Sequence, residues 1–357
     1  MSVSAPTSRG SLQYEEFYGF VQSPFTLAPD PRFLYPSPSH EEAIRLLLQS
    51  VRRREGVAVL SGDIGTGKTT VCRTVLEQLD MTLFTSLVLN PFLSVEELLR
   101  EILLDFGVVS REAVRSGRVT AATKHELVST LHEFLISLVP IGASGVLVID
   151  EAQHLSSQVL EEIRVLSNLE TNRTKLLQIV LVGQLNLLDI LKQPEQRQLD
   201  QRISLRAVLN PLERAEIEAY VAHRLSVARG AEPVTFDATA LGAVQVASGG
   251  VPRLINLLCD RALMLGAQFE SRTMTAHIVN GAAESLGLRT SRRASKRWWL
   301  RLPRWASFGT AILLLVSALM LFAPLHRLIV TSLPEVRRPA FGLAPAVPSG
   351  TLASPPL

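Results

Sequence analysis

Short apolar runs alternate with amphipathic segments between residues 40 and 210. Short apolar runs are typical of buried strands, whereas apolar residues that recur every three to four positions are typical of helices. The sequence predicts strands near residues 57–61, 83–89, 145–150, 176–183 and 203–209. Apolar strands separated by helices favour a parallel sheet covered on both faces, so we expect an α/β domain over residues 40–210.

The segments on either side of this domain have different patterns. Residues 12–38 are rich in proline and aromatic residues. Because the prolines are closely spaced, we expect residues 1–39 to form an ordered lead-in loop without regular structure. After residue 210 the strand pattern ends, and helical segments are broken at "RGAEP" and "SGGVP". We therefore expect residues 211–287 to form a second domain that is entirely helical.

Residues 306–323 form an apolar stretch without a charge. As a helix this stretch would extend roughly 27 Å, close to the ~30 Å hydrocarbon thickness of a bilayer, so we predict one transmembrane helix. A buried core helix is the alternative, but the residues that follow could not cover its far side. The preceding linker, 288–305, is rich in basic residues and tryptophan. This bias predicts a single-pass protein of the inner membrane with its N-terminal domains in the cytoplasm.

Composition limits the possible classes of protein. The net charge is +3, but seven of the 36 Lys and Arg residues lie between Arg289 and Arg304. The basic charge is therefore local and does not indicate that the whole surface binds nucleic acid. Cys72 and Cys259 are the two cysteines and have no metal-ligand spacing, which argues against a disulfide framework or a zinc site.

Residues 62–70, "GDIGTGKTT", lie between an expected strand and an expected helix and fit the phosphate-loop pattern G-x-x-x-x-G-K-[ST]. Glycines let backbone N–H groups turn toward phosphates, and the helix N-terminus adds positive potential. We predict that Lys68 contacts the β- and γ-phosphates of ATP and that the Thr69 hydroxyl binds Mg²⁺. A glycine turn without a ligand is the alternative. The predicted nucleotide-binding residues of the loop are Gly62, Asp63, Ile64, Gly65, Thr66, Gly67, Lys68, Thr69 and Thr70.

The string "VLVIDEAQ" is an expected strand that ends in two carboxylates, Asp150 and Glu151. At a strand end beside the phosphate loop, Asp150 could hold Mg²⁺ through water, and Glu151 could orient and deprotonate the attacking water. Two acids that merely cap a strand at the surface are the alternative. The letters "DEAQH" also allow a helicase interpretation, but a second helicase core domain would not fit after residue 210.

Polar residues at three further positions are candidates for catalysis. Gln184 follows the strand ending in "LVG" and could position the water, unless it is an ordinary loop residue. Arg202 precedes the last strand and is our preferred arginine finger for a neighbouring subunit, with Arg197 as the other candidate. Arg253 follows Pro252 in "SGGVPRLINLL" and could reach the nucleotide of its own subunit. Ordinary solvated or structural arginines are the alternative at these positions.

These motifs together resemble those of the AAA+ ATPases. More narrowly, "GDIGTGKTTVCRTVLEQL", "VLVIDEAQHLS" and "GGVPRLINLLCDRAL" look like the general secretion pathway protein A group, and the similarity runs from Tyr14 to Leu286. That group contains membrane-anchored ATPases of type II secretion, pilus biogenesis and exosortase-associated systems. The resemblance implies a P-loop NTPase core with a parallel sheet and a helical lid, followed here by one transmembrane helix.

The C-terminal tail, residues 324–357, departs from that group. Several relatives carry an extracytoplasmic peptidoglycan-binding domain, whereas this tail has seven prolines and no periodicity. We expect a flexible extracytoplasmic segment, and its length argues against direct peptidoglycan binding.

The function that we expect is ATP hydrolysis that drives assembly or remodelling of an envelope secretion, pilus or polysaccharide export machine. The expected partners are further copies of the chain, envelope assembly or secretion proteins and the inner membrane. A DNA-handling ATPase related to transposition regulators is the alternative, since the run "RTSRRASKR" could contact phosphates. The apolar stretch argues against nucleic acid as the partner. A third interpretation is a nucleotide-gated scaffold that hydrolyses little ATP, but the presence of Glu151 argues against it.

Overall fold

The computed structural model describes residues 13–28, 30–112, 122–228 and 233–288. The chain falls into two compact units, Met1–Ser295 and Lys296–Leu357, and all described residues belong to the first. The predicted transmembrane helix at residues 306–323, the tail and all but the first residue of the basic linker therefore lie outside the described residues. Among the helices that the structure describes, none has both the length and the apolar character needed to span a bilayer.

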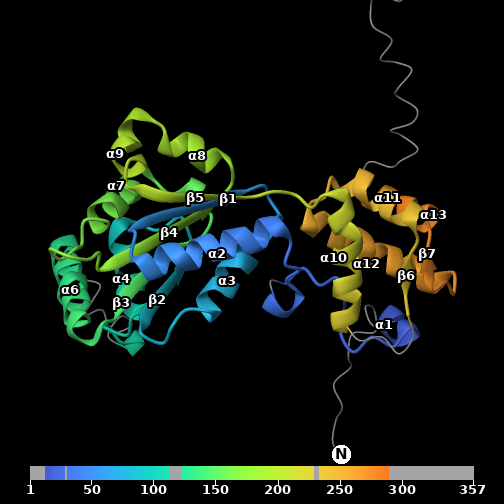
Figure 1. Cartoon of the computed structure of the whole chain (residues 1–357), viewed down its shortest axis with the longest axis horizontal. Coiled ribbons are helices and arrows are strands. Elements are labelled where there is room, and N and C mark those ends of the chain that lie inside the picture. The colour runs from blue at the N-terminus through green and yellow to red at the C-terminus, as the bar shows by residue number, and fades with distance from the viewer. Residues whose placement is uncertain (1–12, 29, 113–121, 229–232, 289–357) are drawn as a thin grey trace, which may run out of the picture. The chain divides into compact units, whose positions relative to one another are not determined.

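Five strands form one parallel sheet (Figure 1). They are β1 (Val57–Gly62), β2 (Leu83–Val88), β3 (Ser144–Ile149), β4 (Leu177–Gly183) and β5 (Ile203–Leu209). The strand order is β2-β3-β4-β1-β5, and each strand ends within one residue of its predicted range. Because β1 pairs with β4 on one side and β5 on the other, the loop that follows β1 emerges between two strand ends. In open α/β sheets ligands bind in the crevice at such carboxyl ends.

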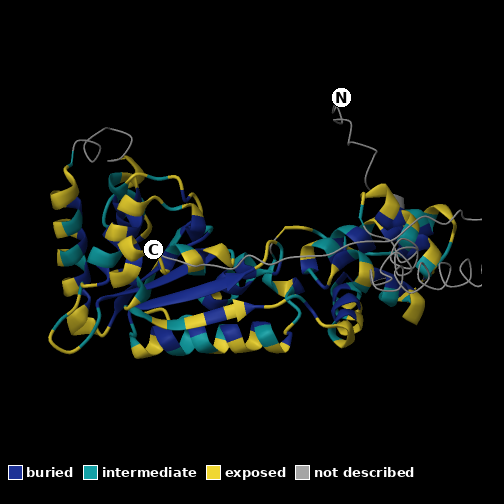
Figure 2. Cartoon of the chain, turned by 90° about the horizontal axis from the view of Figure 1, so that it is seen from above, coloured by how far each residue is buried: buried dark blue, intermediate teal, exposed yellow. Residues whose placement is uncertain are grey.

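Alternate strand residues pack on opposite faces of the sheet. Val57 and Val59 of β1 belong to one hydrophobic cluster, and Ala58 and Leu60 belong to another. The first cluster joins the sheet to α4 (Val95–Asp105), α6 (Lys124–Ser137), α7 (Ser157–Leu166) and α8 (Asn186–Leu191). The second joins it to α2 (Pro38–Arg53) and α3 (Lys68–Glu77). With helices on both faces, the central strands are buried throughout (Figure 2), which explains their continuous apolar sequence.

Short helical turns connect these elements. They are η1 (Pro31–Phe33), η2 (Val139–Ile141), η3 (Ala152–His154), η4 (Pro194–Gln196) and α9 (Arg197–Asp200).

The residues that follow β5 form a helical lid with its own hydrophobic core. Its helices are α10 (Arg214–Ala228), α11 (Ala238–Ser248), α12 (Pro252–Gln268) and α13 (Ala276–Ser285). The expectation of a purely helical domain is wrong in one detail. The two-residue strands β6 (Thr235–Phe236) and β7 (Thr273–Met274) pair in parallel. Each is too short to produce a periodic pattern in the sequence.

The lead-in segment contains a helix, which corrects the expectation of a loop without regular structure. Helix α1 (Gln13–Tyr18) precedes the first proline of the described segment, Pro24, so no ring interrupts it. The Tyr14 hydroxyl donates to Asp260 of α12 at 2.5 Å, and the Tyr18 hydroxyl bonds the Leu263 carbonyl. The lead-in segment is thus packed into the lid core, and Figure 1 shows α1 beside the lid helices.

Candidate functional site

The phosphate loop joins the carboxyl end of β1 to the first turn of α3, as the motif predicts. Gly65 and Gly67 have φ angles of 83° and 98°, which residues with a Cβ rarely adopt. A Cβ at Gly62 would lie 2.8 Å from the Leu209 carbonyl oxygen of β5. The glycines therefore allow both the turn of the loop and the close approach of a neighbouring strand.

Lys68 is folded back onto the loop that contains it. Its Nζ donates to the carbonyl oxygens of Gly62 and Asp63, each at 3.0 Å. The side chain is 6% exposed, and burial lowers the pKa of its ammonium, while the negative charges of Glu151 and Asp150 oppose that shift. Among the described residues this buried ammonium contacts carbonyl oxygens and pairs with no carboxylate at contact distance, so an incoming phosphate could neutralise its charge.

The two predicted Mg²⁺ ligands meet beside the loop. The Thr69 hydroxyl donates to Asp150 Oδ2 at 2.7 Å, and the other Asp150 oxygen accepts from the Glu151 N–H at 2.8 Å. Asp150 is 5% exposed. No group of three or more His, Cys, Asp or Glu in the described part of the chain could by itself hold a metal ion. The pair fits Mg²⁺, which typically takes few protein oxygens and completes its shell with phosphates and water.

Glu151 is held by a side chain that the sequence analysis did not single out. Gln153 lies in η3 and is buried, and its Nε2 donates to Glu151 Oε2 at 2.6 Å. Its Oε1 accepts from the Gln184 N–H at 3.0 Å, so one amide joins the ends of β3 and β4. A Cβ at Gly183 would lie 2.7 Å from that oxygen, so a larger residue there would displace the Gln153 amide. Glu151 itself has a φ of 51°, a strained conformation of the kind found at functional sites.

Gln184 lies at the carboxyl end of β4, as predicted, but its backbone rather than its side chain makes the contact described above. The polar side chain that contacts Glu151 belongs to Gln153 instead. The sequence "DEAQ" contained the signal for this contact. A tight turn after Glu151 brings the side chain of Gln153, two residues later, back to the Glu151 carboxylate.

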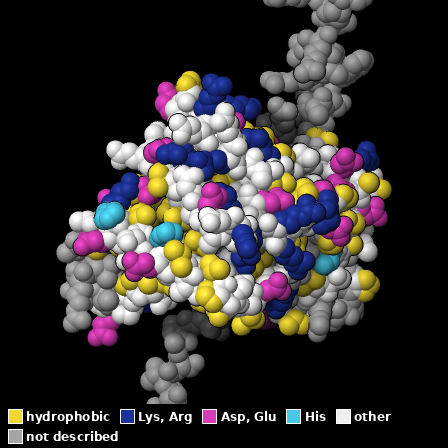
Figure 3. Space-filling model, turned by 60° about the vertical axis from the view of Figure 1, so that its left-hand side comes forward, with side chains coloured by type: hydrophobic (Ala, Val, Ile, Leu, Met, Phe, Trp, Pro, Cys, Tyr) yellow, Lys and Arg dark blue, Asp and Glu magenta, His cyan; other side chains and the backbone are white. Residues whose placement is uncertain are grey.

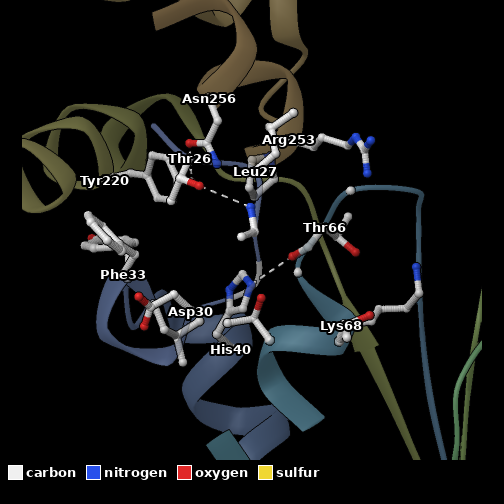
Figure 4. Close-up of a pocket in the computed structure, with 18 of the residues that line it drawn as sticks. Thr26, Leu27, Asp30, Phe33, His40, Thr66, Lys68, Tyr220, Arg253 and Asn256 are labelled. Atoms are coloured by element: carbon white, nitrogen blue, oxygen red, sulfur yellow. Dashed lines mark hydrogen bonds between the residues drawn. The ribbon is translucent and has the colours of Figure 1, made fainter. Parts of the chain in front are cut away.

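The lid contacts the phosphate loop through the start of α12. The Arg253 N–H donates to the Gly65 carbonyl oxygen at 3.1 Å, and a Cβ at Gly65 would lie 2.6 Å from the Arg253 Cβ. The Arg253 side chain is exposed and extends beside the loop (Figure 4). The structure therefore brings Arg253 to the loop of its own subunit, where the sequence analysis expected it.

A cavity of about 260 Å³ opens beside the phosphate loop. The phosphate loop and Glu151 line one part of it. Another part is lined by residues 26–28, 30 and 33–35 of the lead-in segment together with Tyr220 and Asn256 of the lid (Figure 4). The sequence analysis assigned no part of a binding site to the lead-in segment. Its aromatic residues were the available signal, because aromatic side chains concentrate in cores and pockets.

Arg224 of α10 fixes the lead-in segment at this cavity. It is 6% exposed, and it donates to the carbonyl oxygens of Pro24 at 2.6 Å and Thr26 at 3.0 Å. Its guanidinium also lies 4.6 Å from the centre of the Phe33 ring. Removal of Arg224 would leave these carbonyls without a donor from the lid.

The two finger candidates lie at the opposite ends of the strands from the phosphate loop. We call the side of the sheet where the strands begin its amino edge and the side where they end its carboxyl edge. Ile203 pairs with Val57 at the amino end of β1, whereas Leu209 pairs with Gly62 at the phosphate loop. Arg202 is therefore separated from the loop by the length of β1, roughly 20 Å. It donates to Asn168 and, at 3.4 Å, to the Ser167 hydroxyl at the end of α7.

A groove with several basic residues lies at the same amino edge. This open groove of about 690 Å³ is lined by Arg52, Arg53, Arg54, Arg173 and Lys175, with Glu170 as the acidic residue. Figure 3 presents the side of the molecule toward which the strands' amino ends point and shows Lys and Arg side chains on it interspersed with Asp and Glu. Exposed Arg197 lies on the same edge, at the start of α9. The structure thus separates Arg197 and Arg202 from the other predicted site residues.

Comparison with known proteins defines the class. Residues 51–191 match the family model described as an AAA domain. The chain is therefore an AAA-domain protein built on a P-loop core, and an AAA domain implies nucleotide binding. It is homologous to general secretion pathway protein A of Aeromonas hydrophila, with 39% identity over 277 residues that cover 77% of this chain and 49% of that protein. The family resemblance seen in the motifs is thereby confirmed.

A second relative is the ATP-dependent target DNA activator B of Escherichia phage D108. It is 29% identical over 169 residues, which cover 46% of this chain and 48% of that protein. This chain spans about half the length of the curated relatives it matches.

Solved structures support the same fold. Cdc6p from Pyrobaculum aerophilum matches with a TM-score of 0.56 at 17% identity, over 74% of this chain and 70% of that chain. The ORC2 protein of Aeropyrum pernix matches with a TM-score of 0.53 at 15% identity, over 74% and 71%. At these identities the likeness concerns the fold alone, an α/β core with a parallel sheet and a helical lid.

Proposed function

We propose that this chain binds ATP with Mg²⁺ and hydrolyses it. The observation that carries the proposal is the 2.7 Å hydrogen bond between Thr69 and Asp150, because it brings the two expected Mg²⁺ ligands together beside the phosphate loop. Glu151 follows Asp150 directly and lines the same cavity as the loop, so a base is available next to the phosphates.

The arrangement of side chains supports a sequence of contacts in hydrolysis. Lys68 would exchange the Gly62 and Asp63 carbonyls for the β- and γ-phosphate oxygens. A bound Mg²⁺ would be held by Thr69 and, through water, by Asp150, and it would neutralise charge on the same phosphates.

Glu151 would then orient a water molecule toward the γ-phosphorus and accept its proton. A bond forms from the water oxygen to phosphorus, and the bond from phosphorus to the β–γ bridging oxygen breaks, which yields ADP and phosphate. Gln153 donates a hydrogen bond to one Glu151 carboxylate oxygen, which leaves the other oxygen for the water molecule. Arg253, which joins the loop to the lid, would contact the phosphates of its own subunit.

We further propose that the chain acts as a homo-oligomer in which Arg202 serves the site of a neighbouring copy. Its position at the amino edge supports this, because it lies roughly 20 Å from the phosphate loop of its own subunit. An interface between the amino edge of one copy and the carboxyl edge of the next is heterologous and can generate a ring or a filament.

For the biological role we propose an ATPase of the envelope, anchored in the inner membrane by residues 306–323 with the AAA domain in the cytoplasm. Hydrolysis would drive assembly or remodelling of a secretion, pilus or polysaccharide export machine. The homology to general secretion pathway protein A and the uncharged apolar stretch support this role. The tail beyond residue 323 would recruit or tether partners rather than bind peptidoglycan directly.

A DNA-handling ATPase is the second candidate, and the 29% identity to the phage DNA activator over 169 residues favours it. Sequence similarity alone does not separate the two roles, since the chain matches both relatives. The apolar stretch at residues 306–323 does separate them, because a soluble DNA-handling ATPase has no use for a membrane anchor.

Two measurements test the proposal. Phosphate release by the purified full chain should require both ATP and Mg²⁺ and should cease in EDTA. In cells the protein should resist extraction with alkaline carbonate, and protease added to spheroplasts should remove only residues beyond about 324. Release of the whole protein by carbonate, or digestion of its AAA domain from outside, would favour the DNA-handling role.

A further inference from the structure

His40 contacts the phosphate loop from a different element, although no motif includes it. It lies in the first turn of α2 and is 3% exposed. Its Nε2 lies 2.9 Å from the Thr66 carbonyl oxygen (Figure 4), and its Nδ1 lies 2.5 Å from the Ser37 hydroxyl oxygen. Both ring nitrogens are therefore engaged, one with the loop and one with the residue that caps α2.

These partners determine the tautomer of the ring. A carbonyl oxygen only accepts, so Nε2 carries the hydrogen and donates to Thr66. Nδ1 then accepts from the hydroxyl of Ser37, which is fully buried. Burial lowers the pKa of His40, although the Thr66 carbonyl and the charge of Glu216 oppose the shift. The ring is thus neutral at pH 7 and can hold this pair of bonds continuously.

The bond to Thr66 sets the direction of the next N–H group. In a trans peptide the C=O of one residue and the N–H of the following residue point in opposite directions. When the Thr66 oxygen points toward His40, the Gly67 N–H points away from His40. Backbone N–H groups of a phosphate loop meet phosphate oxygens on its concave side, which the Gly67 N–H must therefore face to bind a phosphate.

The ring also packs directly against Gly67. A Cβ at this position would lie 3.1 Å from His40 Nε2, and the Gly67 φ of 98° already disfavours a side chain. The loop is therefore confined on the side of α2 by contact as well as by a hydrogen bond.

The same contacts extend to the far end of the cavity. The Ser37 N–H donates to the Tyr35 carbonyl oxygen at 2.9 Å. The Tyr35 ring packs edge-on against Tyr220 of the lid, with centroids 6.0 Å apart. Both tyrosines line the cavity, so a continuous set of contacts joins its lead-in and lid walls to the phosphate loop.

We propose that His40 is a positioning residue that holds the Thr66–Gly67 peptide in the orientation required for phosphate binding. The proposal rests on the proposed ATP function. It predicts that His40 contributes to nucleotide affinity in proportion to its ability to donate to the Thr66 oxygen.

Two substitutions separate this role from simple packing. The amide nitrogen of His40→Gln can take the place of Nε2 and reach Thr66, whereas the shorter His40→Asn places its amide near Nδ1 and reaches only Ser37. Binding of Mg-ATP to the full-length parent and to both variants would be measured by calorimetry. Melting temperatures without nucleotide and steady-state hydrolysis would be measured in parallel.

We expect His40→Asn to raise the Kd for ATP roughly three- to tenfold, the effect of one lost hydrogen bond, and His40→Gln to stay within about twofold of the parent. The rate at saturating ATP should be unchanged in both, since the chemistry is untouched. Equal affinity in the Asn variant and the parent would overturn the inference. Equal weakening in both variants, in step with a lower melting temperature, would also overturn it. A parent that binds no ATP would overturn the proposed function and this inference with it.

Discussion

The two edges of the five-stranded sheet carry different chemistry. At the carboxyl edge the ends of β1, β3 and β4 bring together Lys68, the Thr69–Asp150 pair and the Gln153-bound Glu151. At the amino edge of the same strands lie Arg202 and a groove lined by five basic residues.

One copy of the chain thus presents the groups that we propose to bind a triphosphate at one edge and a groove rich in basic residues at the other. Because the strands hold the two edges roughly 20 Å apart, the charge of the amino edge cannot act on the site of its own subunit. This difference is the basis of our proposal that the site is completed between two copies.

The largest effect is expected from Lys68→Ala at the carboxyl edge. The change removes the buried ammonium that faces the phosphates, and lost bonds to charged groups of about 1.5–3 kcal/mol each should weaken ATP binding roughly a hundredfold or more. Calorimetric titration with Mg-ATP measures the loss. Binding at the parental affinity would show that the phosphates bind elsewhere.

Glu151→Gln should separate binding from turnover at the same edge. The amide keeps the size of the side chain but cannot accept the proton, so we expect hydrolysis to fall by roughly 10²–10⁴-fold while ATP affinity stays within a few-fold of the parent. Phosphate release and calorimetry measure the two quantities. Hydrolysis at the parental rate would remove Glu151 from its proposed role.

Arg202→Ala tests whether the amino edge acts on a neighbour. Arginine fingers in GTPases are worth about a thousandfold or more, and we expect roughly a hundredfold loss of hydrolysis here because Lys68 and Arg253 also face the phosphates. Mixing the Arg202→Ala and Lys68→Ala proteins should restore part of the activity, since an intact finger then meets an intact phosphate loop.

Arg197→Ala is the matched control, because it removes an exposed arginine from the same edge. A loss of hydrolysis with this variant and none with Arg202→Ala would make Arg197 the finger. No recovery in confirmed mixed oligomers would argue that the two edges do not cooperate.

Gln153→Ala should have a smaller effect, confined to turnover. The change frees the Glu151 carboxylate that Gln153 holds at 2.6 Å, so we expect the rate at saturating ATP to fall roughly tenfold with little change in affinity. Steady-state kinetics separate the two quantities. A changed affinity at a constant rate would mean that Gln153 acts on the loop and not on Glu151.

The smallest effect that we expect is on the pH dependence of stability, through His40 beside the phosphate loop at the carboxyl edge. Burial lowers the pKa of His40 in the folded chain, so the unfolded chain binds a proton more readily, with a pKa of about 6.5. The stability from the neutral ring is therefore present above that value and is lost as the pH falls below it. His40→Gln should reduce the fall in melting temperature between pH 7.5 and 5.5, and equal slopes in parent and variant would contradict this.

Features with local physical causes were predictable from the sequence. The five strands lie within one residue of their expected ranges, because burial on both faces requires continuous apolar runs. A capping box begins α4, with Ser94 and Glu97 each bonding the other's backbone N–H, and the S-x-x-E spacing that produces it is local in the sequence. The phosphate loop was equally predictable, since its glycines and its lysine must be consecutive in the chain to form one turn.

The sequence by itself thus determined the α/β core, the helical lid and the loop with its adjacent carboxylates, since each depends on neighbours within a few residues. Only the tertiary structure decided that the lead-in helix packs into the lid, that Arg224 ties residues 24 and 26 to α10, and that His40 reaches Thr66. It also decided that Arg202 lies at the edge opposite Lys68. Contacts between residues 26 to 246 positions apart depend on how separate elements pack, which no short stretch of sequence specifies.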